Sequence, residues 1–260
     1  MEDEKRLRDI IREEIGAALT DHHIKIDVND IVDQLRKPPA SNSVRAYLNG
    51  EDRFVALFRE RSRRAARDTY DFIDKEMRDA LFHPNQFAVL GDRKDQIAKP
   101  GTNIVDLGVY KGGSTRALAK MFPDYTIHGF DSFEGLPEDW SHAIKGSFGE
   151  IQGALPDMPG NVKLYKGWFD QTLPVWAREH AGTPISLLRV DCDIYSSTKT
   201  IFDELGQFVE SGTWICFDEL IGYYGFADHE HKAFMEFIAR TGFKYKYVAY
   251  GLTYTIARIL

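Results

Sequence analysis

The chain has 260 residues, of which 43% are hydrophobic and 28% charged, and it carries a net charge of −7 with a pI of about 5.6. This composition predicts a globular protein with one good core and an appendage, and the negative charge argues against a nucleic-acid partner, which would favour a basic face. The N-terminus is charged, which argues against a signal peptide, and the apolar runs stay well short of the roughly 20 residues that span a bilayer. We therefore expect a cytoplasmic protein with no membrane partner. Cys192 and Cys216 lie in apolar stretches and are expected to be reduced thiols of the core.

The first third of the chain has the pattern of helices. Apolar residues recur at helical spacing between residues 7 and 19, Pro38 and Pro39 interrupt the pattern, and a charged helical stretch runs from about Asp52 to Leu81. We expect residues 1–90 to form a helical N-terminal extension that serves oligomerisation, as a dimer, or covers the substrate as a lid. Residues 91–260 are expected to form the main domain.

Short apolar runs alternate with helical stretches from Asn103 onward. The expected strands are "NIVDLG", "TIHGFD", "VKLYKG", "ISLLRVDCD" and "TWICFDE", and the final runs "YKYVAYG" and "TYTIARI" are expected to pair antiparallel. Alternation of strand and helix predicts a mostly parallel sheet that is covered on both faces. Such sheets bind ligands at the carboxyl ends of their strands, so the residues that follow each strand are the candidates for function.

A glycine-rich turn, "VDLGVYKGGST", follows the first strand. Tyr110 stands where a nicotinamide-binding turn has its second glycine, and no Lys follows Gly113 as a Walker loop requires. The turn therefore lacks both patterns that cradle phosphates. A glycine turn that only joins a strand to a helix is the plainer alternative.

The remaining residues of this turn suggest a different ligand. Asp106 lies beneath the turn and suits an ammonium or sulfonium group, whereas Gly108 and Gly112 let the backbone turn tightly and leave room for a ligand. Ser114 or Thr115 is expected to cap the following helix.

The next two strand ends suggest a bound nucleoside. Asp131, in "GFDSFEG", is placed to accept hydrogen bonds from two ribose hydroxyls, although a turn or helix-capping aspartate would have the same pattern. Trp168 and Phe169, in "KGWFDQTLP", are placed to flank an adenine ring, or else they belong to the core.

Carboxylates gather at the ends of the last two parallel strands. Asp191 and Asp193 end one strand, and Asp218 and Glu219 end the other. Their mutual repulsion in a partly dry cleft would be costly, and a hard divalent cation such as Mg²⁺ would relieve it. We expect Asp193 to cap a helix and the other three acids, Asp191, Asp218 and Glu219, to bind a metal. The alternative is that these three acids bind substrate or cap helices without a metal.

Four segments stand out at the strand ends and after them: "DSFEGLP", "GWFDQTLP", "VDCDIYSSTKT" and "FDEL" followed by "HEHKAF". With these segments the chain resembles class I S-adenosylmethionine-dependent methyltransferases, and more narrowly the macrocin O-methyltransferase (TylF-like) family, which acts on sugar hydroxyls of antibiotics. The resemblance covers roughly residues 100–250. It implies an α/β class I methyltransferase fold, Rossmann-like, with a seven-stranded, mostly parallel sheet and one antiparallel strand.

The resemblance also implies site residues. It implies a metal, Mg²⁺, on Asp191, Asp218 and Glu219, although Glu219 stands where the sugar methyltransferases usually have a second Asp. The expected contacts with S-adenosylmethionine are Asp106, Gly108, Tyr110, Gly112, Ser114, Thr115, Asp131, Ser132, Trp168, Phe169 and Asp191. Candidate bases for the acceptor hydroxyl are His142, His229, His231 and Asp191 itself.

The expected activity is methyl transfer from S-adenosylmethionine to a hydroxyl of a small molecule, a sugar unit of a natural product or a phenol, with help from Mg²⁺. Two segments, residues 133–160 and the aromatic run around Tyr223 and Tyr224, are expected to line the acceptor pocket. The alternatives are a metal-independent methyltransferase that acts on an amine or a phenol, and a methyltransferase fold retained as a non-catalytic binding partner. A nicotinamide oxidoreductase is disfavoured by Tyr110.

Overall fold

A computed structural model describes residues 50–141 and 143–260. The chain divides into two compact units, residues 1–60 and 61–260, and helix α4 (Gly50–Glu76) crosses the division. The expected boundary at residue 90 thus falls inside the second unit, because strand β1 (Leu81–Phe82) pairs with β7 in the main sheet. The helical pattern expected between residues 7 and 19 and the break expected at Pro38 and Pro39 lie outside the described residues.

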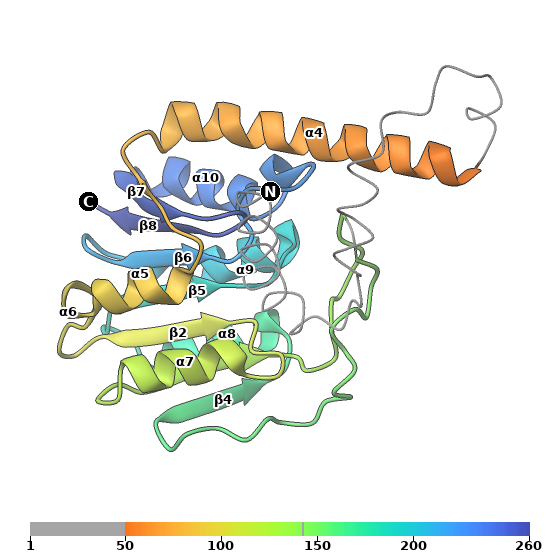
Figure 1. Cartoon of the computed structure of the whole chain (residues 1–260). Coiled ribbons are helices and arrows are strands. Elements are labelled where there is room, and N and C mark those ends of the chain that lie inside the picture. The colour runs from red at the N-terminus through yellow and green to blue at the C-terminus, as the bar shows by residue number, and fades with distance from the viewer. Residues whose placement is uncertain (1–49, 142) are drawn as a thin grey trace, which may run out of the picture. The chain divides into compact units, whose positions relative to one another are not determined.

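The second unit is built on one eight-stranded sheet, in the order β1-β7-β8-β6-β5-β2-β3-β4 (Figure 1). The further strands are β2 (Asn103–Leu107), β3 (Ile127–Asp131), β4 (Val162–Lys166), β5 (Ile185–Val190), β6 (Trp214–Phe217), β7 (Tyr245–Tyr250) and β8 (Thr255–Ile259). Strand β8 runs antiparallel to β6 and β7, whereas the other described pairs are parallel. The expected sheet is therefore confirmed, with β1 as an additional edge strand too short to leave a sequence pattern.

Helices cover both faces of this sheet, as Figure 1 shows. One layer holds α5 (Gln86–Asp92), α6 (Lys94–Ile97) and α7 (Gly113–Met121); the other holds α8 (Phe169–Glu179), α9 (Tyr195–Leu205) and α10 (Glu230–Thr241), with the short helices η3 (Gly206–Phe208) and η4 (Phe226–Asp228) beside them. Each layer buries its apolar stripe in a separate core cluster on its own face of the sheet. None of the described helices is long and apolar enough to cross a bilayer.

Helices α5 and α7 begin differently. The Asn85 side chain caps α5 by accepting hydrogen bonds from the N–H groups of Phe87 and Ala88. Helix α7 starts after Gly112, whose backbone is left-handed, and no side chain caps it. The expectation that Ser114 or Thr115 caps this helix is therefore wrong; the Thr115 hydroxyl bonds elsewhere.

The strand register places charged residues side by side. Asp106 of β2 pairs with Arg189 of β5, and Arg189 pairs with Cys216 of β6. Side chains two residues apart on a strand point to the same face. The register therefore predicts that Asp191 and Asp218, two residues beyond Arg189 and Cys216, continue the same row toward the carboxyl edge.

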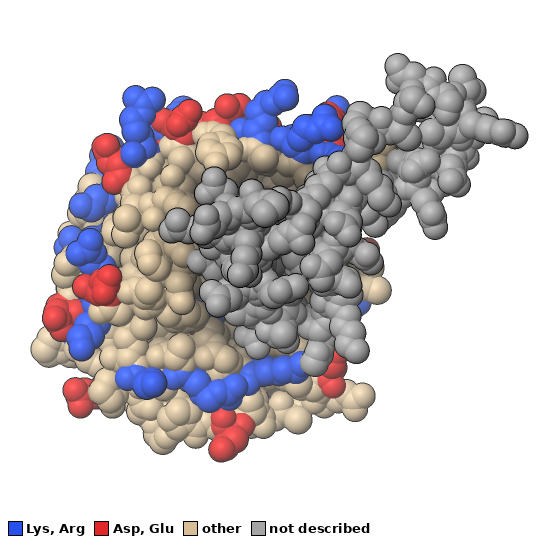
Figure 2. Space-filling model, in the orientation of Figure 1, with Lys and Arg blue, Asp and Glu red and all other residues tan. Residues whose placement is uncertain are grey.

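Charged side chains of both signs surround the face of the molecule that Figure 2 shows. A row of Lys and Arg crosses the lower part of this face, with acidic side chains next to it. Among the coloured residues of this view, positive and negative groups are thus interspersed, in keeping with the modest net charge of −7.

A buried histidine lies under α8. His128 of β3 is 5% exposed, and its Nδ1 accepts a hydrogen bond of 3.1 Å from the Trp176 indole. That bond requires an unprotonated Nδ1, so the ring is neutral with its proton on Nε2. Burial, and then the neighbouring His180 and Lys163, lower the pKa of His128 to about 4.

This lowered pKa makes the fold sensitive to acid. Below the ordinary pKa of 6.5 the unfolded chain binds a proton at His128 that the folded chain does not, so stability falls as pH falls toward 4. We expect the wild type to lose about 3 kcal/mol more than His128→Asn between pH 7 and pH 4. Urea unfolding of both proteins across this range measures the difference, and parallel curves would contradict it.

Candidate functional site

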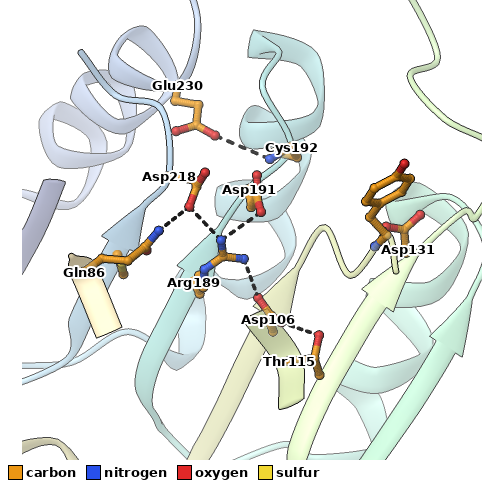
Figure 3. A network of polar contacts seen from close by, with 11 residues as sticks. Gln86, Asp106, Thr115, Asp131, Arg189, Asp191, Cys192, Asp218 and Glu230 are labelled. Atoms are coloured by element: carbon orange, nitrogen blue, oxygen red, sulfur yellow. Dashed lines mark hydrogen bonds and ion pairs between the residues drawn. The ribbon is translucent and has the colours of Figure 1, made fainter. Parts of the chain in front are cut away.

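Three carboxylates from three strands meet around one arginine, as Figure 3 shows. Arg189 donates from Nη1 to Asp106 Oδ1 at 3.0 Å, and from Nη2 to Asp191 Oδ2 at 2.8 Å and Asp218 Oδ1 at 2.7 Å. The register described above places these side chains in one row at the carboxyl edge of β2, β5 and β6. Two of the three expected metal-binding acids, Asp191 and Asp218, are therefore brought together here.

Arg189 supplies a positive charge that the expectation of a metal did not include. Its side chain is 3% exposed. Burial lowers its pKa, but Asp191, Asp218 and Asp106 together raise the pKa well above the ordinary value, so the guanidinium stays charged. The repulsion among the acids is thus relieved in part by the protein itself, and a divalent cation is not the only way to balance them.

More acids lie beside this network. Burial, and then repulsion from Asp218, raise the pKa of Asp191; burial also raises the pKa of Asp193 to about 7 and that of Glu219 well above its ordinary range. Asp193 and Glu219 share a hydrogen bond, which opposes the shift at Asp193. Asp193 also has a φ of +66° and does not cap α9, because no side chain caps that helix.

Glu230, the first residue of α10, adds a sixth carboxyl group that the sequence did not single out. It is fully buried, its Oε1 is 3.5 Å from the backbone nitrogen of Cys192, and its Oε2 has no partner. Burial, and then Asp193 and Asp191, raise its pKa well above the ordinary range. In the part of the chain that the structure describes, no group of three or more His, Cys, Asp or Glu side chains is arranged to hold a metal ion as it stands.

The glycine turn lies directly against this edge. Gly108 has a φ of +101°, and a Cβ at this position would lie 1.7 Å from the Asp191 carbonyl oxygen. Gly112 has a φ of +81°, and a Cβ there would lie 2.0 Å from the methyl group of Met158. The two glycines therefore make room for the end of β5 and for a side chain of the β3–β4 loop, in addition to any ligand.

Asp131 organises the other side of the turn. Its carboxylate accepts hydrogen bonds from the backbone N–H of Tyr110 at 2.7 Å and of Phe133 at 2.6 Å. Both residues have a positive φ, +48° and +58°, which residues other than glycine rarely adopt. Burial raises the pKa of Asp131 and these backbone bonds oppose the rise. Asp131 thus fixes the turn, and its oxygens retain lone pairs for a ligand.

Asp106 and Thr115, both expected to contact the cofactor, form a fully buried pair. The Thr115 hydroxyl donates to Asp106 Oδ2 at 2.7 Å, and Arg189 occupies Oδ1. Because both oxygens of Asp106 are engaged and neither residue is exposed, these two side chains hold the strand end in place and do not themselves reach a ligand. Direct contact through Asp106 is therefore not supported.

The other expected cofactor residues lie around the same turn. Ser132 accepts a hydrogen bond from Glu134 N–H and donates to Gly135 O, so its hydroxyl belongs to the turn after β3. Ser114 lies half-buried in the first turn of α7, and Trp168 and Phe169 lie half-buried where α8 begins. Their contact with a ligand stays a prediction.

The candidate bases are less well placed. His142 lies outside the described residues. His229 precedes α10, its pKa is lowered by burial, and its ring centroid is 5.9 Å from that of Tyr223. His231 packs against Phe72, with ring centroids 4.9 Å apart. Among the described residues, neither His229 nor His231 forms a hydrogen bond to the carboxylates, whereas Asp191 lies in the network itself.

The two segments expected to line an acceptor pocket do meet. The rings of Trp140 and Tyr223 are 5.5 Å apart, which joins the β3–β4 loop to the loop after β6. The β3–β4 loop also reaches the glycine turn, because Tyr110 donates to Glu150 at 2.9 Å. Arg61 of α4 donates to the Ser141 carbonyl at 2.7 Å and packs over the ring of Tyr224.

Two residues that the sequence did not single out shape the site most. Arg189 gives a weak signal, a charge inside the otherwise apolar strand "ISLLRV". Gln86 gives none; its amide NH₂ donates to Asp218 Oδ1, and its Oε1 accepts from the Cys216 thiol at 3.0 Å. Only the packing of α5 against β6 brings Gln86 to the acids.

Comparisons with known proteins concern the domain and its fold. Residues 105–220 match the family model of a methyltransferase domain. No curated protein matches the chain significantly in sequence.

Solved structures with the same fold include two methyltransferases. The calicheamicin methyltransferase CalS11 gives a TM-score of 0.54 at 19% identity, over 66% of this chain and 77% of that chain. The O-methyltransferase NovP gives a TM-score of 0.51 at 20% identity, over 66% of this chain and 78% of that chain. At this identity the likeness establishes the shared fold, and it confirms the expected class I architecture.

Proposed function

We propose that this chain transfers the methyl group of S-adenosylmethionine to a hydroxyl of a small molecule, and that the acceptor is a sugar unit of a natural product. The match of residues 105–220 to the family model of a methyltransferase domain supports the proposal. The observation that carries the proposal is the acidic edge of Asp191 and Asp218 directly beside the glycine turn. A donor held at the turn would present its reactive group to this edge.

The chain offers a place for each part of the donor. S-Adenosylmethionine supplies a methyl group that is already activated by its sulfonium centre. Asp131 would accept from the ribose hydroxyls with its remaining lone pairs, Trp168 and Phe169 would flank the adenine, and Gly108 and Tyr110 would contact the donor through the backbone of the turn. The acidic edge, with Asp191 nearest the turn, would face the positive sulfonium.

The reaction requires positioning and one proton transfer. The acceptor oxygen forms a bond to the methyl carbon while the carbon–sulfur bond breaks, and its electron pair stays on sulfur. The hydroxyl proton passes to a base. We propose Asp191 for this role, because its carboxylate lies in the network and its side chain is 28% exposed, with His229 as the second candidate and His142 as a third outside the described residues.

The acceptor class follows from the surroundings of the acids. Trp140, Tyr223 and Tyr224 lie on the two segments that meet near the edge, and aromatic walls suit sugars and planar phenols. CalS11 is described as a TDP-rhamnose 3'-O-methyltransferase, and NovP as an O-methyltransferase; both share this fold. We therefore propose a sugar hydroxyl first and a phenol second.

The donor atoms for a metal fit Mg²⁺ in kind. Asp191 and Asp218 each have one oxygen bonded to Arg189, and Glu219 has a buried oxygen without a partner. These hard oxygen donors are the ligands that Mg²⁺ prefers. We propose that the open oxygens of these three side chains would hold the ion, which would lower the pKa of an acceptor hydroxyl.

The proposal is tested by methyl transfer with labelled donor. Purified protein is incubated with S-adenosylmethionine bearing a ¹³C-methyl group and a panel of glycosylated natural products, phenols and amines, and the products are analysed by mass spectrometry. We expect the label on a hydroxyl oxygen. Label on nitrogen alone would contradict the proposed chemistry, and donor binding without transfer to any acceptor would favour a non-catalytic role.

Repeating the assay in EDTA separates the two enzymatic alternatives. We expect turnover to fall at least tenfold in EDTA and to recover when Mg²⁺ is added. Unchanged turnover would overturn the metal role and leave Arg189 as the cation that balances the acids. Size-exclusion chromatography with light scattering tests the accompanying proposal of a dimer, and cell fractionation tests that of a cytoplasmic protein.

A further inference from the structure

The guanidinium of Arg189 is used in an unusual way. Its Nη1 and Nη2 donate to three carboxylates, one at each of three strand ends, and among the described residues its buried Nε has no partner. Nη1 holds Asp106 beneath the glycine turn, whereas Nη2 is shared by Asp191 and Asp218. One planar group thus links the donor side of the site to its acidic edge.

Gln86 holds one of these acids from a second direction. Its NH₂ donates to the same oxygen of Asp218 that Arg189 contacts, and the Cys216 thiol donates to its Oε1 at 3.0 Å. Because a carboxylate accepts, the NH₂ end of the amide faces Asp218, and the thiol bonds the opposite end. The Asp218 carboxylate is held through one oxygen by two donors, so its rotation is restricted.

Exposure differs sharply within the network. The side chain of Arg189 is 3% exposed, but those of Asp191 and Asp218 are 28% and 24% exposed. Figure 3 shows the second oxygen of each of these two carboxylates on the side away from the guanidinium. Arg189 is thus buried, whereas each of the two carboxylates keeps part of its surface exposed and has one oxygen directed away from the guanidinium.

We propose that Arg189 and Gln86 are positioning residues of the methyl-transfer site, which set the direction of the free oxygens of Asp191 and Asp218 toward the acceptor. This inference rests on the proposed function, because it assumes that these two oxygens meet the acceptor or its metal ion. Neither Arg189 nor Gln86 touches the acceptor itself.

A purely structural role explains the arrangement less well. Buried ion pairs contribute little net stability compared with packed apolar side chains. If the ion pair between Arg189 and Asp218 served the fold alone, it would not need Gln86 as a second donor to the same Asp218 oxygen, itself bonded by the Cys216 thiol. The convergence on the two partly exposed acids indicates orientation.

The first test replaces Gln86, because this change removes one of the two donors to Asp218, together with the acceptor of the Cys216 thiol, and no charge. In Gln86→Met we expect kcat to fall about tenfold, KM for the acceptor to change less than threefold, and the Kd for S-adenosylmethionine to stay within twofold of wild type. Gln207→Met, the same change at an exposed position bonded to the Glu204 carbonyl, is the matched control and should leave all three unchanged. Equal kcat in wild type and Gln86→Met would overturn the proposal.

The second test replaces Arg189 while keeping its charge. Arg189→Lys cannot reach three carboxylates with a planar fork, so we expect a larger fall in kcat than in Gln86→Met, about 100-fold. The control is Arg240→Lys, whose guanidinium bonds Asp203 and the Phe202 carbonyl away from the site. If Arg189→Lys does not fold, Gln86→Met alone decides.

Crystal structures of wild type and Gln86→Met give a readout that needs no acceptor. We expect the Asp218 carboxylate to rotate in the variant, and an unchanged carboxylate would overturn the inference even if no acceptor is found. Conversely, a wild type that binds donor but methylates nothing overturns the proposed function. An active wild type with an equally active Gln86→Met overturns only the positioning roles.

Discussion

Replacing Gly108 by alanine is expected to lower the free energy of unfolding by at least about 3 kcal/mol and to abolish binding of S-adenosylmethionine. The new Cβ would lie 1.7 Å from the Asp191 carbonyl oxygen, and φ at this position is +101°. Either the end of β5 or the glycine turn must move. Because Asp191 N–H donates to Leu107 O at 2.8 Å, the two segments are tied together and the displacement spreads to both. Chemical denaturation and calorimetry with the donor measure the two effects.

Gly101→Ala is the matched control. Gly101 also has a positive φ, +75°, but a Cβ there meets nothing within 4 Å. Its replacement carries only the backbone penalty, which is about 1 kcal/mol, and should leave donor binding intact. Similar losses for the two variants would show that the close approach to Asp191 does not exist in solution.

The second large effect is expected for Asp131→Asn. Asparagine offers one oxygen where the carboxylate offers two, so the N–H of either Tyr110 or Phe133 would face an NH₂ group. Both N–H groups hold residues with positive φ, and losing one bond releases that strain by moving the turn. We expect a loss of about 2 kcal/mol in stability and at least a tenfold loss in donor affinity.

Asp203→Asn provides the comparison for this change. Asp203 bonds Lys199 and Arg240 on the surface, where ion pairs contribute about 0–1 kcal/mol. Donor affinity should be unchanged in this variant. Wild-type affinity in Asp131→Asn would contradict the role of Asp131 at the cofactor.

The architecture could be predicted from the sequence because each element carries its own pattern. The buried runs at β2, β5 and β6 and the helical stretches between them predict a mostly parallel sheet covered by helices, although they do not give the order of its strands. Strand β1 could not be predicted, because two residues have no periodicity and their pairing with β7 depends on tertiary contacts. Because this pairing leaves no pattern in the sequence, the start of the second compact unit at residue 61, well before residue 90, could not be predicted either.

The site could be predicted only in part. Asp131, Asp191 and Asp218 follow strands, and the topology of parallel sheets alone brings such residues to one edge. The sequence does not show which groups neutralise them. Gln86 reaches Asp218 across 132 positions of the chain, and Glu230 is buried by the docking of α10, so neither contact leaves a local pattern.

The most direct test of the acidic edge is a crystal structure of the protein with S-adenosylhomocysteine bound. We predict the ribose hydroxyls within hydrogen-bond distance of Asp131, and the sulfur atom at the glycine turn facing the open side of Asp191 and Asp218. A product bound elsewhere, or bound at the turn with both carboxylates directed away from its sulfur, would contradict the account.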